Sequence, residues 1–414
     1  MSPLSPVRKR CVFYVSGFDP KGAAHYHALY QAEATKQSRL NGWQLDVGAR
    51  KRLPGGNSAW PIHAQDGKGT EVQTHYEVMR WDDVVRKNWP MHTLALWRDL
   101  LATTLFNLRH GSLWRMFQLS WPPAVALFSP FALLVLIALL APLATVLLGG
   151  WIVAAHELPL WTGVGASALS VAGLALTGRY LEARYSMYWL TRSYAFTARQ
   201  AKGKTPDLEA RLDEQALRLV ERICSEQDDE VLVVGHSSGT IMAVSIAARA
   251  CALLQALPHG TPRAKLSLMK LGQCIPLLAL LPQAKRFRAE LALLGQAAWV
   301  DWIDFSAPPD GCCFALSDPL ALTDDGRGRS PKLLSPKFAE MFPLLPYQAL
   351  RQDKYRMHFQ YLMAHERAVD YDYFAISAGD QTLSERFAHL ESVRNFTDLR
   401  GCPALRNEAR QLPN

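Results

Sequence analysis

The sequence is nearly devoid of charge over one long stretch. Between Arg115 and Arg179 lie 63 residues with a single formal charge, Glu157. At the chain-wide content of 20% charged residues, about 13 would be expected there. The chain as a whole has 414 residues, a net charge of +8 and 49% hydrophobic residues. This composition excludes a disordered, collagen-like or disulfide-scaffold protein, and one uncharged block interrupts an otherwise ordinary globular sequence.

Metal and redox motifs are also missing. The seven cysteines are odd in number, and no pair has the spacing of a zinc knuckle or a CxxC redox pair. We therefore expect buried free thiols in a reducing compartment. The first ten residues lack the apolar core of a signal peptide, which predicts that the N-terminal segment stays in the cytoplasm.

The uncharged block predicts two membrane-spanning helices. The run 124–148 is 25 residues long and has no charge. As a helix it would span about 37 Å, against a bilayer core of about 30 Å. The second run, 159–178, is rich in Gly, Ala and Ser, which let membrane helices pack closely. A buried helical pair in a soluble core would instead keep some polar face.

The flanking charges predict an orientation. Arginines precede and follow the block, whereas the connection 151–158 has no Lys or Arg. By the positive-inside rule both termini lie in the cytoplasm and the connection lies on the other side. Glu157 alone offers little polar pathway, which argues against a transporter. The spread of the excess positive charge argues against nucleic-acid binding, and the arginines near the membrane explain part of it.

The flanking segments alternate predicted strands and helices. This alternation predicts an α/β fold with a mostly parallel sheet flanked by helices. Residues 50–70 are expected to be loop. The chain then divides into an N-terminal part of one domain at 1–120, the transmembrane hairpin at 121–179 and the C-terminal part of that domain at 180–414. Strands are expected at 11–15, 43–47, 70–81, 230–234, 266–271 and 299–305, and helices at 23–40, 91–119, 180–201, 206–227, 240–257 and 284–295.

One sequence motif predicts catalytic residues. The run Gly235-His236-Ser237-Ser238-Gly239 fits G-x-S-x-G, follows a buried apolar run and opens a helical one. A sharp strand-to-helix turn needs small residues two positions before and after the serine. Ser237 would be the nucleophile at the N-terminus of the helix, and the backbone N–H of Ser238 an oxyanion donor. The alternative is an ordinary glycine-rich turn or a nucleotide-binding loop, but no Lys-Ser/Thr pair follows, which disfavours a P-loop.

This motif, in the segment 231–240, resembles the α/β-hydrolase superfamily, particularly its lipase- and esterase-like members. His236, before the nucleophile, is frequent in that superfamily. The segment 13–19 is similar to the strand and loop that supply the second oxyanion donor, which implies the backbone N–H of Phe18. The segment 299–310 is similar to the strand before the triad acid. The resemblance implies an α/β-hydrolase-like sheet, with the hairpin as an insertion that has no counterpart in the common pattern.

A serine nucleophile needs a base and an orienting carboxylate, in the order Ser, acid, His on this fold. Asp310, in a turn just past a predicted strand, is the favoured acid, with Asp304 as the alternative. His358 is the favoured base, with His365 as the alternative.

The resulting prediction is a membrane-anchored serine hydrolase that cleaves an ester-type substrate through an acyl-enzyme, lipids being among the candidate substrates. The partners it implies are the lipid bilayer and a hydrophobic ester. It needs no metal and no organic cofactor, and the pair His25 and His27 lacks a third ligand nearby for a metal site. The alternative is a catalytically inactive member of the fold that serves as an interaction scaffold.

Overall fold

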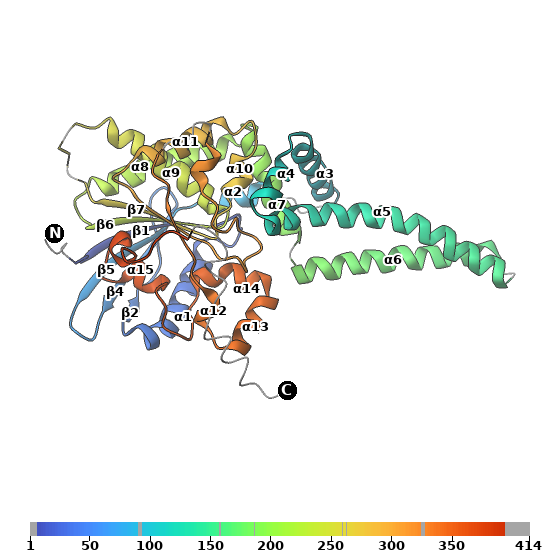
Figure 1. The fold of residues 1–414 in the computed structure, drawn as a ribbon, viewed down its shortest axis with the longest axis horizontal. Coiled ribbons are helices and arrows are strands. Elements are labelled where there is room, and N and C mark those ends of the chain that lie inside the picture. The colour runs from blue at the N-terminus through green and yellow to red at the C-terminus, as the bar shows by residue number, and fades with distance from the viewer. Residues whose placement is uncertain are drawn as a thin grey trace.

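The computed structural model describes residues 6–89, 93–156, 159–185, 187–258, 260–261, 263–323 and 328–393. These residues form an α/β body from which a long helical hairpin projects (Figure 1). Segments before and after the hairpin contribute strands to the same sheet. The two flanking parts of the sequence therefore build one body.

The sheet in the described ranges has nine strands in the order β2-β4-β5-β1-β6-β7-β8-β9, with β3 paired to β4. The run from β5 to β9 is parallel, whereas β4 is antiparallel to β2, β3 and β5. The predicted mostly parallel sheet flanked by helices is confirmed. The strands are β1 (Lys9–Val15), β2 (Gln44–Val47), β3 (Lys51–Arg52), β4 (Ser58–Gln65), β5 (Glu71–Val78), β6 (Glu230–His236), β7 (Lys265–Leu271), β8 (Asp301–Phe305) and β9 (Lys332–Leu334).

The central strands are apolar because both faces of the sheet are covered. Every residue of β6 is buried, as expected for a parallel strand between two layers of helices. A buried ion pair joins β6 to β1: Arg10 Nε lies 2.8 Å from Glu230 Oε2, and the two residues are register partners. This pair ties the first strand of the chain to the strand that leads to Ser237.

The prediction that residues 50–70 form a loop is wrong in part. The glycine-rich ends of this segment do form turns, but β3 and β4 lie between them. Strand β4 alternates buried and exposed residues and pairs with β5 along its whole length. Trp60 stacks on Tyr76 of β5, with ring centroids 4.6 Å apart. The strand forms because its buried side chains pack on a partner that comes later in the chain.

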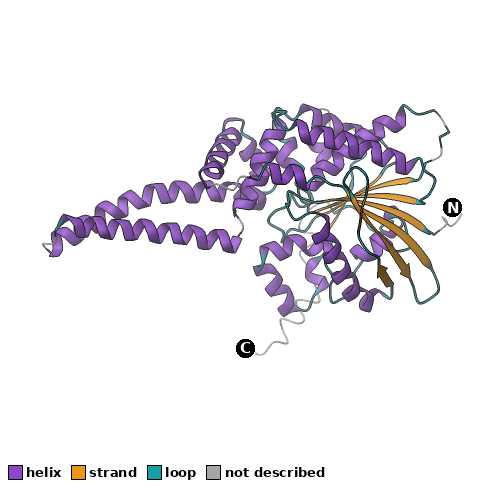
Figure 2. Cartoon of the chain, turned by 180° about the vertical axis from the view of Figure 1, so that it is seen from behind, coloured by secondary structure: helices purple, strands orange, loops and turns teal. Residues whose placement is uncertain are grey.

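Helices cover both faces of the sheet (Figure 2). One layer contains α8, α9 and α11, and the other contains α1 and α12–α15, and each layer has its own apolar core. The helices of the body are α1 (Ala23–Asn41), α2 (Asp82–Lys87), α8 (Pro206–Ile223), α9 (Gly239–Gln255), α10 (Pro276–Ala279), α11 (Lys285–Gln296), α12 (Phe338–Met341), α13 (Leu344–Gln352), α14 (Lys354–Phe359), α15 (Tyr373–Ala378) and α16 (Leu383–Arg386), with 3₁₀ turns at Pro319–Leu322 and Gln360–Leu362.

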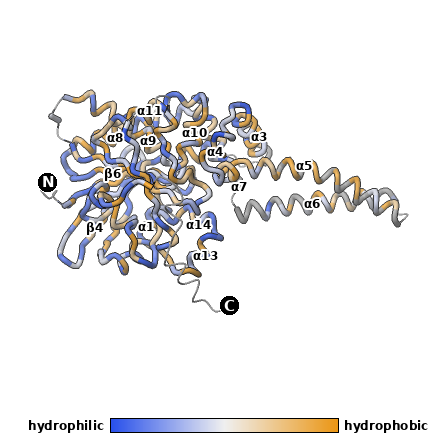
Figure 3. Tube along the Cα trace, viewed as in Figure 1, coloured by the Kyte–Doolittle hydropathy of each residue, from blue (hydrophilic) through white to orange (hydrophobic). Residues whose placement is uncertain are grey.

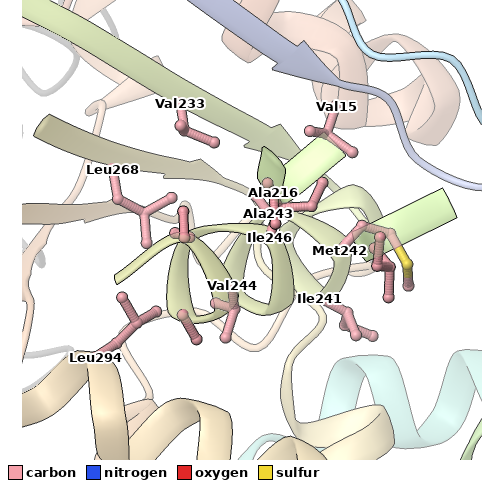
Figure 4. Close-up of a cluster of buried hydrophobic side chains, with 14 of the residues drawn as sticks. Val15, Ala216, Val233, Ile241, Met242, Ala243, Val244, Ile246, Leu268 and Leu294 are labelled. Atoms are coloured by element: carbon pink, nitrogen blue, oxygen red, sulfur yellow. The ribbon is translucent and has the colours of Figure 1, made fainter. Parts of the chain in front are cut away.

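Helix α9, which follows Ser237, is the most enclosed helix of its layer. Nearly all its residues are buried, between the sheet and its helical neighbours α8 and α11. Figure 4 shows Ile241, Val244 and Ile246 of α9 among side chains from these neighbours. The N-terminus of α9 is therefore held firmly against the sheet.

Two long helices form the hairpin, α5 (Trp121–His156) and α6 (Leu160–Tyr185), which lie side by side (Figure 1). Shorter helices join it to the body: α3 (Thr93–Arg109) and α4 (Ser112–Leu119) before it, and α7 (Met187–Ala201) after it. The single helix expected over 91–119 is thus two helices, because Gly111 adopts φ +66° between them. Glu157 lies outside the described residues.

Apolar residues recur along the hairpin (Figure 3), and many of their large side chains are exposed. Leu139 is 65% exposed, Val146 69% and Leu169 76%. Within the described ranges, no helix combines the length and the apolar character needed to cross a membrane, so the two predicted membrane-spanning helices are not confirmed.

Candidate active site

Ser237 occupies a strained turn. It lies between the end of β6 and the start of α9 and adopts φ +58°, a conformation uncommon outside glycine. Its backbone N–H donates to the carbonyl of Leu271 on β7 at 2.9 Å, and its own carbonyl accepts from the N–H of Thr240 at 3.0 Å. The surroundings fix the strained backbone, and the side chain remains partly accessible.

The two glycines of the motif make this turn sterically feasible. A Cβ atom on Gly239 would lie 2.4 Å from the carbonyl oxygens of Val15 and Ser16, at the end of β1. A Cβ atom on Gly235 would lie 2.8 Å from Cα of Thr240. The turn is therefore pressed against the neighbouring strand, and any side chain at position 239 would push the two apart.

Asp310 and His358 lie in direct contact. Asp310 follows β8, His358 is in α14, and His358 Nδ1 lies 2.9 Å from Asp310 Oδ2 and 3.1 Å from Oδ1. The carboxylate also accepts from the Cys312 N–H at 3.0 Å and the Tyr361 hydroxyl at 3.2 Å. Burial raises the pKa of Asp310, but His358 and these donors outweigh it and hold that pKa below its usual range. An ionised Asp310 fixes the proton on Nδ1 and leaves Nε2 of His358 as an acceptor.

The alternative acid, Asp304, has another partner. Its Oδ2 lies 3.0 Å from Nζ of Lys270, its register partner on β7, and both side chains are fully buried. Burial raises the pKa of Asp304, although Lys270 opposes this. Asp304 therefore belongs to an ion pair inside the sheet.

The alternative base, His365, also lies apart from Asp310. Its Nδ1 donates to the carbonyl of Arg367 at 2.7 Å, and its Nε2 lies 3.1 Å from Nε2 of Gln37 on α1. Burial lowers its pKa. Of the sequence-predicted acids and bases, the structure brings together Asp310 and His358.

His236 connects the serine turn to the helix of the base. It is buried, and its Nε2–H donates to the backbone carbonyl of His358 at 2.9 Å. Burial, together with the nearby His358, lowers the pKa of His236 to about 3. A neutral His236 thus supports the backbone of His358.

The expected oxyanion donor, Phe18, is already engaged. Its backbone N–H donates to Ser238 Oγ at 2.8 Å, and its carbonyl accepts from Trp189 Nε1 at 2.5 Å. A Cβ atom on the preceding Gly17 would lie 3.0 Å from Cβ of Ser237. The loop is close enough to serve Ser237, but the Ser238 hydroxyl occupies the N–H that a substrate oxygen would need.

Cys274 lies in contact with both Ser237 and the start of the hairpin. Burial raises the pKa of Cys274 to about 12, with a smaller contribution from Asp310, while a hydrogen bond with Ser237 lowers it. Cys274 packs in one apolar cluster with Ala124 and Leu127 of α5. The Cys274 thiol stays protonated at neutral pH and contacts both Ser237 and the cluster at the start of α5.

The site holds one group of potential metal ligands. Asp310, Cys312 and His358 present ligand atoms within 4.8 Å of one another. Burial and the neighbouring Asp310 raise the pKa of Cys312 well above its usual value, and Asp310 is already paired with His358 Nδ1. The donor set suits the carboxylate–imidazole pair better than a metal ion.

Several residues of the site could not be predicted from the sequence. Tyr361 and Cys312 steady Asp310, and Trp189 holds the Phe18 carbonyl. Trp189 lies in α7, the helix that follows the hairpin. No pattern in the sequence links these residues to Ser237, because each reaches the site through tertiary packing.

The closeness of Gly239 to β1 is directly testable. Gly239→Ala should destabilise the protein by about 3 kcal/mol or more, because the added methyl overlaps two backbone carbonyls that cannot move independently. Gly311→Ala is the matched control, since a Cβ atom there meets nothing within 4 Å, and it should change stability by less than about 0.5 kcal/mol. Thermal unfolding of both variants in mild detergent measures the difference, and equal melting curves would contradict the geometry.

Comparison of the chain with protein-family models, curated proteins and solved structures found no match in any of the three. The resemblance of the serine motif to the α/β-hydrolase superfamily therefore rests on this chain's own residues and geometry.

Proposed function

We propose that this chain is a serine hydrolase that cleaves ester-type substrates. The observation that carries the proposal is the strained Ser237 turn, which is joined through His236 to the Asp310–His358 pair. Ser237 follows β6, Asp310 follows β8 and His358 follows β9. Because β6, β8 and β9 are parallel strands of one sheet, their carboxyl ends lie at the same edge, where ligands bind in α/β folds. The order Ser, Asp, His supports membership of the α/β-hydrolase superfamily.

In this proposal His358 Nε2 accepts the proton of Ser237 Oγ as Oγ attacks the ester carbonyl carbon. Asp310 holds the imidazole tautomer and stabilises the imidazolium. The Ser238 N–H, at the N-terminus of α9, stabilises the oxyanion, and the Phe18 N–H joins it once the Ser238 hydroxyl rotates away. The imidazolium then protonates the leaving alcohol, and a water activated by His358 hydrolyses the acyl-enzyme.

We also propose that the hairpin anchors the enzyme to a membrane, with the body and both termini in the cytoplasm. The support is the run of 63 residues with one formal charge and the exposed apolar side chains of α5 and α6. Single exposed apolar residues are normal in soluble proteins, but a contiguous apolar surface of this extent marks an interaction site. The alternative, an inactive scaffold, keeps the hairpin but needs no reactive serine.

The reactive serine is the first test. A fluorophosphonate probe should label the wild-type chain, and Ser237→Ala should abolish labelling because it removes the proposed nucleophile. Ser245→Ala, on the buried interior of α9, is the control and should label normally. If the folded wild type takes up no label under conditions where other serine hydrolases react, the inactive scaffold is the correct function.

The two aspartates should separate activity from stability. Asp310→Asn should keep the fold but lower kcat by about 10⁴-fold, because the wrong imidazole tautomer results. Asp304→Asn should destabilise the fold by about 3–5 kcal/mol by leaving Lys270 unpaired in the core, while the folded fraction keeps its activity. Ester hydrolysis normalised to folded protein measures both, and the reverse assignment of the effects would contradict this account.

Ser238 gives a sharper test of the oxyanion loop. Ser238→Ala frees the Phe18 N–H, which is then buried without a partner until an oxyanion forms. The unmade bond is worth about 1–1.5 kcal/mol, so fluorophosphonate labelling should accelerate by up to about tenfold. Slower labelling of Ser238→Ala would show that the hydroxyl supports the active arrangement instead of blocking it.

Membrane anchorage is tested by extraction. The wild-type chain should stay in the membrane pellet after alkaline carbonate washing and enter detergent. A variant with a short linker in place of residues 121–185 should leave the pellet. Reporter fusions should place both termini in the cytoplasm and the connection between α5 and α6 outside. Release of the wild type by carbonate, or termini outside, would contradict the proposed anchorage or its orientation.

A further inference from the structure

A cleft of about 560 Å³ lies at the foot of the hairpin. Its first wall is the segment 117–122, the end of α4 and the first turn of α5. Its second wall is the loop 307–309 that leads to Asp310, and its third is the segment 337–340 with α12. Helices α12 and α13 stand on the side of the body from which the hairpin projects (Figure 1). The volume is within the range of small-molecule sites.

The cleft borders residues that contact Asp310, the proposed acid. Phe338 on its wall packs against Tyr361, with ring centroids 4.9 Å apart, and the Tyr361 hydroxyl donates to Asp310. The loop 307–309 and the serine turn both follow parallel strands, so they lie at the same edge of the sheet. The cleft therefore borders the same edge of the sheet as the serine turn.

The lining suits an apolar chain. Most of the side chains that face the cleft are aromatic, aliphatic or proline, and its two charged residues are close to each other. Lys337 Nζ lies 3.6 Å from Glu340 Oε2, so the positive charge is offset. Trp121 at the other wall is 65% exposed and is the first residue of α5, the apolar helix of the hairpin. The apolar lining is thus continuous with the apolar surface of the hairpin.

We propose that this cleft binds the acyl chain of the substrate, which makes esters of long-chain fatty acids the substrate class. The proposal rests on the serine hydrolase function proposed above. An acyl chain that lies between α4, α12 and the loop 307–309 places its ester end toward the Asp310 side and its methyl end toward the foot of α5. The hairpin then supplies both the anchor and one wall of the binding site.

The test is a chain-length profile of the full-length protein in mild detergent. 4-Nitrophenyl esters with acyl chains of 2 to 12 carbons are the substrates. For the wild type, kcat/KM should rise with chain length, by up to about fourfold for each methylene group that becomes buried. Ala339→Trp fills the cleft from its partly buried wall and should lower kcat/KM for the dodecanoyl ester by about tenfold or more, with the acetyl ester unchanged.

Ala349→Trp is the matched control, because Ala349 is exposed on the neighbouring α13 and does not line the cleft. It should hydrolyse all esters as the wild type does. A flat wild-type profile, or an equal effect of Ala339→Trp on short and long esters, overturns the acyl-chain assignment while leaving the hydrolase intact. If Ala339→Trp does not fold, the wild-type profile alone decides. Failure to hydrolyse even the acetyl ester rejects the hydrolase, and the acyl-chain assignment with it.

Discussion

The close approach of the Ser237 turn to β1 is the constraint on which the site depends. Gly239 has no room for a side chain because the carbonyls of Val15 and Ser16 lie against it. This contact forces the chain from β6 into α9 through a positive φ at Ser237. It also brings the loop after β1, with Phe18, beside the serine. One steric contact therefore fixes the backbone of the Ser237 turn and the place of the Phe18 loop beside it.

The hairpin and the site share a boundary. Trp189, in the helix that follows the hairpin, holds the Phe18 carbonyl and packs against Tyr355 and Phe359 on either side of His358. Ala124 and Leu127, at the start of the hairpin, pack with Cys274, the neighbour of Ser237. The start of the hairpin thus packs near Ser237, and the helix that follows the hairpin packs near His358. The proposed hydrolase site and the proposed membrane anchor therefore lie next to each other.

The sequence predicted the parts of the fold in which local pattern and tertiary environment agree. The apolar run of β6, the motif glycines Gly235 and Gly239, and the helix after Ser237 are contiguous in the chain. The sequence therefore predicted the turn. Strand β4 was missed because its alternation is short, lies between glycine-rich turns and becomes a strand only through pairing with β5. The sequence left both Asp304 and Asp310 as candidate triad acids. Lys270, the buried partner of Asp304, lies on another strand, so no local pattern links the two residues. The hydrogen bond from the Phe18 N–H to Ser238 Oγ depends on the side-chain rotamer of Ser238, which no sequence pattern indicates.

The central claim is that Ser237 becomes covalently acylated. The most direct measurement is mass spectrometry of the protein after it is mixed with a 4-nitrophenyl ester and quenched in acid within milliseconds to seconds. The account predicts a mass increase equal to the acyl group, located by peptide mapping on Ser237. An acyl group on Ser238 or Cys274, or ester hydrolysis without any acylated protein, would contradict it.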